Sequence, residues 1–136
     1  MKSYKLNNGV DIPLIGLGTY PMNGKTLLLT TIHALRLGYT YFDTASAYSN
    51  EKYLGYGLKL TFKKRKDIFI STKLSNDQQR EGNVKAALIN SLSALKVDYV
   101  DLYLIHWPVP ETYIDSWKQM EHLYEMGYAR AIGVCN

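Results

Sequence analysis

The sequence predicts an α/β protein built from parallel strand–helix units. Short apolar runs alternate along the 136 residues with longer segments whose apolar residues recur at helical spacing. Such alternation is typical of parallel strands joined by right-handed helical crossovers. The run at residues 99–105 is almost continuously apolar, as expected of a strand that is covered on both faces. Five strands and four helices fit either a doubly wound sheet or the first five-eighths of a (β/α)8 barrel.

The predicted elements follow one another regularly along the chain. An Asn-Asn-Gly turn at residues 7–9, between two extended segments, predicts a β-hairpin within residues 1–13. Five strands are predicted after it, at residues 14–18, 39–42, 67–72, 99–105 and 129–134. Four helices are predicted between them, at residues 25–37, 50–60 and 83–95 and in the segment from Ile114 to Gly127. We expect Gly38 to end the first helix and Asn50 to cap the second.

The composition predicts a single globular domain that spans residues 1–136. Apolar residues make up 46% and charged residues 21% of the chain, which excludes an intrinsically disordered protein. There is no run of about 18 apolar residues and no signal-like apolar segment at the N-terminus, so we expect neither a membrane partner nor secretion. The single cysteine, Cys135, cannot form an intrachain disulfide, which fits a cytoplasmic protein. The basic run Lys63–Lys66 has no interleaved aromatic residues and predicts a solvated loop rather than a nucleic-acid site.

Polar residues stand where each apolar run ends. Gly18 and Thr19 follow the first predicted strand, Asp43 the second, Lys73 the third, His106 the fourth and Asn136 the fifth. Taken alone, each of these is more simply explained as a solvated loop residue. Ligands of α/β folds gather at the carboxyl ends of the strands, however, so the side chains are predicted to converge on one site. Their joint placement therefore favours a functional site.

Other candidate residues fail on their surroundings. His33 and His122 lie inside predicted helices without a second ligand one turn away, so no metal site is expected. Cys135 follows a buried strand with no base nearby in the sequence, which favours a packed thiol over a nucleophile. Gly16 and Gly18 form a G-x-G pair, but the third glycine and the acidic residue of a dinucleotide-binding Rossmann unit are missing.

Five segments carry a resemblance to a known family. They are Leu-Ile-Gly-Leu-Gly-Thr-Tyr at 14–20, Asp-Thr-Ala with Ala-Tyr-Ser-Asn-Glu at 43–51, Ser-Thr-Lys-Leu at 71–74, the run at 98–108 that contains Ile-His-Trp-Pro, and Ile-Gly-Val-Cys-Asn at 132–136. In this order and spacing they resemble the aldo-keto reductases, with cysteine at position 135 where serine is commoner. The resemblance runs through the whole chain and favours the barrel over the doubly wound sheet.

The resemblance implies reduction of aldehydes or ketones to alcohols with NAD(P)H. It implies four catalytic residues, Asp43, Tyr48, Lys73 and His106. Tyr48 would donate a proton to the carbonyl oxygen, and Lys73, paired with Asp43, would stabilise the phenolate that remains. His106 would donate a hydrogen bond that orients the carbonyl oxygen.

The resemblance also implies where the cofactor and the substrate bind. The implied cofactor contacts are Gly18, Thr19, Tyr20, Asp43 and Asn136, the last through the nicotinamide carboxamide. The implied contacts of the small carbonyl substrate are Tyr20, Tyr48, His106 and Trp107. NADPH is the expected cofactor, with NADH as the alternative, because the residues that would distinguish them lie outside this chain.

The length of the chain limits what the resemblance implies. A complete barrel of this kind needs about 250 residues, whereas this chain ends after its fifth predicted strand. In the family, the missing strands bring the pyrophosphate and adenosine sites. We therefore expect weak or no activity from the 136-residue chain alone, and self-association through apolar surface at the open barrel edges.

Three interpretations of the shortened barrel stay open. The leading one is a piece of a longer reductase. The alternatives are a non-catalytic binding or assembly protein on the same scaffold, and an inactive truncated product. The potassium-channel β subunits are binding proteins that resemble reductases and differ at the position of His106, so this histidine favours carbonyl chemistry.

Overall fold

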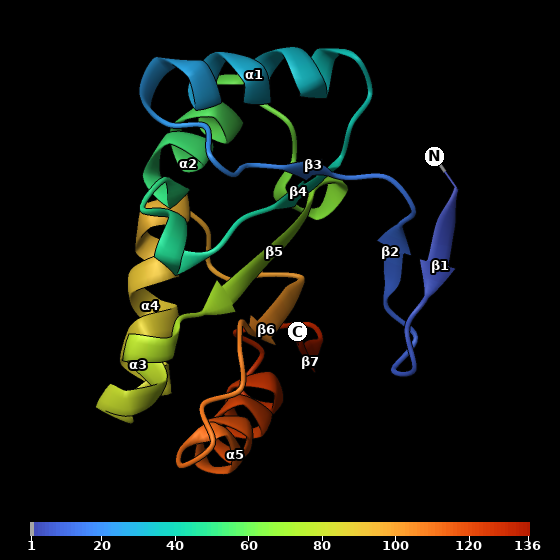
Figure 1. Ribbon diagram of the computed structural model, residues 1–136. Coiled ribbons are helices and arrows are strands. Elements are labelled where there is room, and N and C mark those ends of the chain that lie inside the picture. Colours follow the sequence, from blue (N-terminus) through green and yellow to red (C-terminus); the bar gives the residue numbers. More distant parts are fainter. Residues whose placement is uncertain (1) are drawn as a thin grey trace.

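The computed structural model describes residues 2–136 and contains a five-stranded parallel sheet with helices packed along it (Figure 1). The strands of the sheet are β3 (Leu17–Gly18), β4 (Tyr41–Asp43), β5 (Phe69–Leu74), β6 (Leu102–Ile105) and β7 (Ile132–Val134). The helices are α1 (Gly24–Arg36), α2 (Glu51–Leu60), α3 (Asn76–Glu81), α4 (Val84–Leu95) and α5 (Tyr113–Glu125). Short 3-10 turns occupy Ser46–Tyr48 and Arg65–Asp67.

The order of the strands determines the topology. Each strand pairs in parallel with the strand that follows it in the sequence, in the order β3-β4-β5-β6-β7. With right-handed crossovers, every connecting helix then falls on the same face of the sheet. A doubly wound sheet would instead carry helices on both faces. The prediction of an α/β fold with the first five strands of a (β/α)8 barrel is confirmed.

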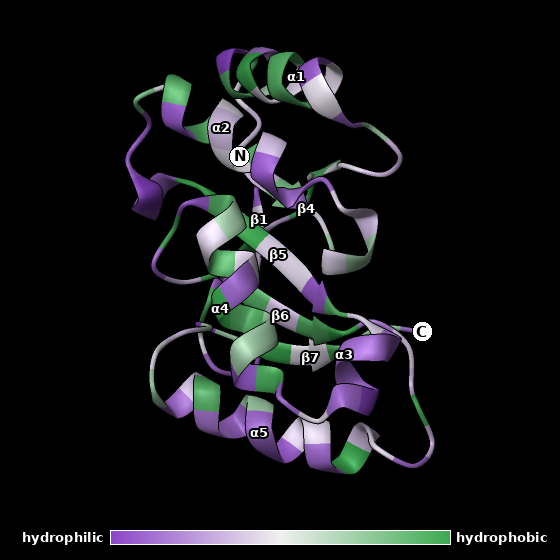
Figure 2. Ribbon diagram, turned by 90° about the vertical axis from the view of Figure 1, so that its left-hand side faces the viewer, coloured by the Kyte–Doolittle hydropathy of each residue, from purple (hydrophilic) through white to green (hydrophobic). Residues whose placement is uncertain are grey.

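The hydrophobic core lies between the sheet and its helices. Phe42 of β4 and Ile70 of β5 are completely buried there, together with Leu27 of α1, Leu54 of α2 and Leu88 of α4. Figure 2 shows mainly apolar residues along β6 and β7 and many hydrophilic residues along α5. The helices are therefore held to the sheet mainly by apolar burial.

Strand β5 separates two environments, because successive side chains of a strand point to opposite faces. Ile70 and Leu74 belong to the core under the helices, and Thr72 bonds to a residue of α2 on that same side. Ser71 and Lys73 lie on the other face, where both contact Asp43 of β4. On this inner face, Lys73 and Asp43 lie near the carboxyl ends of their strands.

The N-terminal hairpin consists of β1 (Ser3–Lys5) and β2 (Asp11–Pro13), paired antiparallel as predicted; Met1 lies outside the described residues. Its turn reaches the beginning of the last strand, because the side-chain amide of Asn8 donates to the carbonyl oxygen of Arg130 at 2.9 Å. The hairpin therefore lies at the amino ends of the strands, away from the polar residues that follow them.

The first barrel strand is shorter than predicted. Only Leu17 and Gly18 pair with β4, and Leu14 and Ile15 are 58% and 59% exposed instead of buried. The backbone N–H of Leu14 donates to Lys2 O at 3.0 Å, so this residue extends the hairpin rather than the sheet. The prediction of a buried strand over residues 14–18 was wrong at its beginning, because β3 is an edge strand with a neighbour on one side only within residues 2–136.

Helix α3 was not predicted. Its sequence, Asn-Asp-Gln-Gln-Arg-Glu, has no apolar spacing from which a helix could be recognised. The local signal is a capping box: the Ser75 hydroxyl accepts from the N–H of Gln78, and the Gln78 side chain accepts from the N–H of Ser75.

The two edges of the sheet are open. Among the described residues β3 pairs only with β4, and β7 pairs only with β6. Val134 of β7 is 71% exposed, and Leu14 and Ile15 are exposed beside β3. The expectation of unpaired edges with apolar surface is confirmed. Such edges are prone to pair with further strands.

Candidate active site

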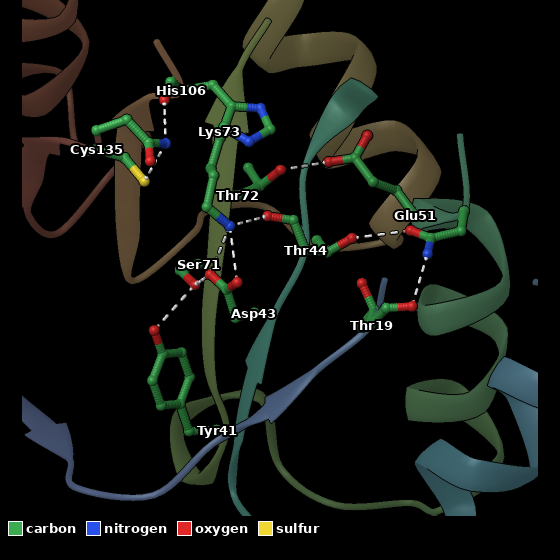
Figure 3. Close-up of polar contacts among 12 residues, drawn as sticks. Thr19, Tyr41, Asp43, Thr44, Glu51, Ser71, Thr72, Lys73, His106 and Cys135 are labelled. Atoms are coloured by element: carbon green, nitrogen blue, oxygen red, sulfur yellow. Dashed lines mark hydrogen bonds and ion pairs between the residues drawn. The ribbon is translucent and has the colours of Figure 1, made fainter. Parts of the chain in front are cut away.

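The polar residues predicted to converge do meet at the carboxyl end of the sheet. Asp43 ends β4, Lys73 is the penultimate residue of β5, and His106 and Asn136 follow β6 and β7. Tyr48 ends the 3-10 turn that comes after β4. Figure 3 shows a close-up of the residues around Lys73.

The ammonium group of Lys73 is fully bonded and nearly buried. Its Nζ donates to both carboxylate oxygens of Asp43, at 2.8 and 2.7 Å, and to Thr44 O at 2.9 Å (Figure 3). The residue is only 5% exposed. An ammonium has three N–H donors, so these three acceptors fix its position as well as compensate its charge.

Asp43 accepts a hydrogen bond from the Ser71 hydroxyl group, which in turn contacts the Tyr41 hydroxyl group; neither contact was predicted from the sequence. Ser71 Oγ donates to Asp43 Oδ1 at 2.5 Å, and the Tyr41 hydroxyl lies 3.1 Å from Ser71 Oγ (Figure 3). Burial raises the pKa of Tyr41, an effect that the Ser71 hydrogen bond opposes and the charge of Asp43 reinforces. Ser71 could have been found from its position two residues before Lys73, which places both on one face of the strand.

Tyr48 stands between the lysine and the histidine. Lys73 Nζ lies 5.4 Å from the centre of the Tyr48 ring, and the centre of the His106 ring lies 5.7 Å from it. The Tyr20 ring also packs against Tyr48, at 5.1 Å between ring centres. Trp107 stacks beside His106 at 6.4 Å. Tyr20, Tyr48, His106 and Trp107 thus form a row of neighbouring rings, with the exposed Tyr20 and Trp107 at its two ends.

The surroundings of His106 favour the neutral form of its imidazole. Partial burial lowers the pKa of the imidazole, the positive charge of Lys73 lowers it further, and Asp43 opposes these effects. A neutral imidazole carries one N–H donor and one acceptor nitrogen, and is suited to donating a hydrogen bond to an oxygen without bringing a second charge.

Asn136 lies beside His106 with part of its amide free. Its Nδ2 donates to His106 O at 2.9 Å and to Cys135 Sγ at 3.2 Å. Within residues 2–136 its Oδ1 has no hydrogen-bond partner, and the residue is exposed. A primary carboxamide such as that of nicotinamide carries N–H donors that match this free acceptor.

The residues after β3 divide into two groups. Gly18 and Tyr20 are exposed at the site. Thr19 is completely buried, its N–H donates to Asp43 O at 2.9 Å, and its carbonyl oxygen accepts from Asn50 Nδ2 at 3.1 Å. Its hydroxyl has no partner among the described residues. Thr19 therefore supports the loop from inside, while its two neighbours face outward.

Asn50 takes a different role from the one predicted. Its side chain makes no cap hydrogen bond to α2. Instead Nδ2 donates to Thr19 O and to Met22 O at 2.9 Å, and Oδ1 accepts from Thr44 Oγ1 at 3.0 Å. The predicted capping role was wrong, because these buried carbonyl groups need a donor that no nearer residue supplies. Asn50 thereby fastens the loop that carries Tyr20 to the end of β4.

The remaining candidates lie elsewhere. His33 and His122 are exposed on α1 and α5. No three His, Cys, Asp or Glu side chains of the described chain are gathered closely enough to hold a metal ion. Within residues 2–136 no helix has both the length and the apolar character needed to cross a bilayer.

Comparison with known proteins identifies relatives of this arrangement. The model of the aldo/keto reductase family matches residues 14–136. The methylglyoxal reductase DkgA of Escherichia coli O157:H7 is 42% identical over 134 residues, and the glyoxal reductase of Bacillus subtilis is 43% identical over 133 residues. Both alignments include 97% of this chain but 48% of the relative, so the chain spans about half the length of the curated relatives it matches.

Solved structures agree with the sequence matches. The crystal structure of an aldo/keto reductase from Brucella melitensis superposes with a TM-score of 0.93 at 38% identity, covering 98% of this chain and 53% of that one. A Bombyx mori aldo-keto reductase in complex with NADP superposes with a TM-score of 0.88 at 33% identity, covering 98% and 50%. The chain therefore matches the amino-terminal half of barrels of this kind.

Proposed function

The chain belongs to the aldo/keto reductase family, and we propose that it forms the catalytic half of a reductase that converts aldehydes and ketones to alcohols with NADPH. The observation that carries the proposal is the position of Tyr48. Its ring stands 5.4 Å from the charge-compensated ammonium of Lys73 and 5.7 Å from the ring of His106. A phenol beside a cation and a neutral imidazole is suited to giving a proton to a carbonyl oxygen.

Each of the four residues has a distinct part in this chemistry. Tyr48 donates its proton as negative charge develops on the carbonyl oxygen. Lys73 stabilises the phenolate that remains, and Asp43 keeps the lysine in place through two hydrogen bonds. His106, whose pKa is lowered by burial and by Lys73, donates a hydrogen bond that orients the same oxygen.

The cofactor site in this half is the nicotinamide end. When bound, NADPH supplies the hydride that the carbonyl carbon receives. The free Oδ1 of Asn136 could accept a hydrogen bond from the nicotinamide carboxamide, and the exposed Gly18 and Tyr20 are proposed to contact the nicotinamide ribose. Thr19 supports that loop from below through its backbone, and Asp43 is 32% exposed at the same end of the sheet.

The substrate is proposed to be a small carbonyl compound. The exposed rings of Tyr20 and Trp107, at the two ends of the row of rings, are proposed to contact it, with Tyr48 and His106 between them. Two of the relatives are named methylglyoxal reductase and glyoxal reductase, which favours short α-oxoaldehydes as the first compounds to assay.

Reduction is proposed to need the three strand–helix units that this chain lacks. The chain covers about half of its relatives, and the open edges of β3 and β7 are where further strands would join. A misplacement of the reacting atoms by about 1 Å can cost around 10²-fold in rate. The 136-residue chain alone is therefore expected to bind NADPH weakly and to turn over little.

The test substitutes Tyr48→Phe in a protein that carries the remaining strand–helix units. Loss of the proton donor should lower methylglyoxal reduction by about 10²–10⁴-fold while NADPH binding, followed by nicotinamide fluorescence, stays nearly unchanged. A rate within about tenfold of the unsubstituted protein would contradict the role of Tyr48. Tight NADPH binding without any carbonyl reduction in the unsubstituted protein would instead favour the alternative of a non-catalytic binding protein.

A further inference from the structure

The ends of α1 and α2 carry the two most exposed large apolar side chains of the described chain. Phe62 is 93% exposed and Leu37 is 80% exposed. Leu37 is the residue that directly follows α1, and Phe62 is the second residue after α2. The two helices pack side by side (Figures 1 and 2), and one hollow is lined both by Arg36 and by Phe62. We call Arg36, Leu37, Lys59, Phe62, Lys63 and Lys64 the α1–α2 tip.

Phe62 occupies a backbone conformation that glycine normally supplies. Its φ is +54°, in the left-handed region, at the position after a helix where glycine is preferred. A bulky side chain is strained there. Because the ring is almost fully exposed, contacts within the described chain do not explain why phenylalanine stands at this position. The outlier therefore points to a contact outside the chain.

The surroundings of Phe62 are basic. Two hollows of about 300 and 440 Å³ flank the ring, and no Asp or Glu lines either of them. Within residues 2–136, neither Arg36 nor the three lysines of the tip form an ion pair. The carboxyl end of a helix carries about half a negative charge, so Arg36 and Lys59 in the last turns of α1 and α2 are sufficient to balance the two helices. Lys63 and Lys64 are therefore not required to balance the helix dipoles.

We propose that the α1–α2 tip docks on an anionic lipid surface, with Phe62 and Leu37 entering the headgroup region and the basic side chains contacting lipid phosphates and carboxylates. To bury two protruding apolar side chains, a rigid protein partner would need two complementary pockets. The headgroup region of a bilayer is fluid and can accommodate protruding side chains without such pockets. The sequence predicts no membrane partner because no segment could span a bilayer; docking on a surface needs none. The tip lies at the outer helix layer, away from the catalytic end of the sheet, so docking is independent of the proposed reduction.

The test measures co-sedimentation of the 136-residue chain with vesicles of phosphatidylcholine alone and with added phosphatidylserine. Binding is expected only with phosphatidylserine and at about 0.1 M salt, and should weaken at about 1 M salt, where charges are screened beyond about 3 Å. Phe62→Gly should lower the vesicle partition coefficient about tenfold or more. Since glycine is preferred at this left-handed position, the variant should fold at least as well, and a fall in binding is not a consequence of unfolding. Each of Lys63→Gln and Lys64→Gln should lower it about fivefold.

Matched controls separate the tip from the open barrel face. Val134→Ser removes another exposed apolar side chain, from β7, and Lys85→Gln with Lys118→Gln removes exposed charge from α4 and α5. These variants should bind vesicles as the unsubstituted chain does. Loss of binding in Val134→Ser with retention in Phe62→Gly would overturn the proposal, because the barrel face would then be the adhesive surface. Equal binding to both kinds of vesicle, or binding to polyglutamate but not to vesicles, would also overturn it, the latter in favour of an acidic protein partner.

Discussion

Strand β5 separates two buried charged groups, Lys73 on its inner face and Glu51 of α2 on its helix-covered face. Lys73 has a counter-ion, Asp43, whose side chain is 32% exposed at the carboxyl end of the sheet. Glu51 has none among residues 2–136; its Oε1 accepts from Thr72 Oγ1 at 2.6 Å (Figure 3), and its Oε2 accepts from Ser91 Oγ at 3.0 Å. Both groups are nearly buried, yet only one of them belongs to the proposed reaction.

The difference teaches how burial can serve two purposes. Burial raises the pKa of Glu51, and the two hydroxyl groups oppose that effect without cancelling it. The glutamate joins α2, β5 and α4, so it works as a structural link between layers. Lys73, in contrast, lies beside the rings of Tyr48 and His106 at the proposed site. A buried charged group can take part in a reaction when it lies next to the reacting groups and its counter-ion is partly exposed at the same site, as Asp43 is.

The largest expected effect comes from Lys73→Met in a protein with all the strand–helix units. Without the cation the phenolate of Tyr48 is no longer stabilised, so the rate of carbonyl reduction should fall about 10²–10³-fold. Thr72→Val, one residue away on the other face, is the matched control. It should leave the rate unchanged and lower the free energy of unfolding by about 1–3 kcal/mol, since Glu51 loses a hydrogen bond. Equal rates for both variants would remove the distinction between the two faces.

A smaller effect is expected from Glu51→Gln, measured by denaturant unfolding of the 136-residue chain as a function of pH. The pKa of Glu51 is raised in the folded protein, so its contribution to stability is complete below the ordinary glutamate value of about 4.3 and is lost as the pH rises through the raised value. The glutamine variant cannot ionise and lacks this loss. Its stability relative to the unsubstituted chain should therefore increase with pH across that range. A difference that does not change with pH would contradict the assignment.

The smallest effect concerns His106. Its pKa lies below the ordinary value of about 6.5, chiefly through burial and then through Lys73, so the unfolded chain takes up a proton at a pH where the folded one does not. The contribution of His106 therefore destabilises the fold as the pH falls below about 6.5. Lys73→Met should raise the pKa of His106 part of the way back, as followed by NMR titration of the ring. Thr72→Val should leave it where it is.

The sequence predicted the parts of this molecule that depend on local periodicity. The order of strands and helices and the convergence of Asp43, Lys73 and His106 followed from apolar spacing and from the geometry of parallel strands. Most partners of Asn50 and Glu51 could not be predicted in this way, since their hydrogen bonds to Thr19, Met22, Thr72 and Ser91 join residues 21 to 40 positions apart. Helix α3 was not predicted, because a short polar helix has no apolar face that would reveal helical spacing in the sequence.

The hydrogen bond from Asn8 to Arg130 has a consequence for the order in which the chain folds. It joins residues 122 positions apart, whereas the side-chain contact between Asp43 and Lys73 spans 30. Closing a loop about four times longer costs roughly 1.2 kcal/mol more entropy, since each doubling costs about 0.6 kcal/mol. On the ribosome, the hairpin made first must therefore wait until β7 emerges before it can dock. The two hairpin strands bury little surface of their own. The contact between the hairpin and Arg130 is therefore expected to form last during folding and to break first during unfolding.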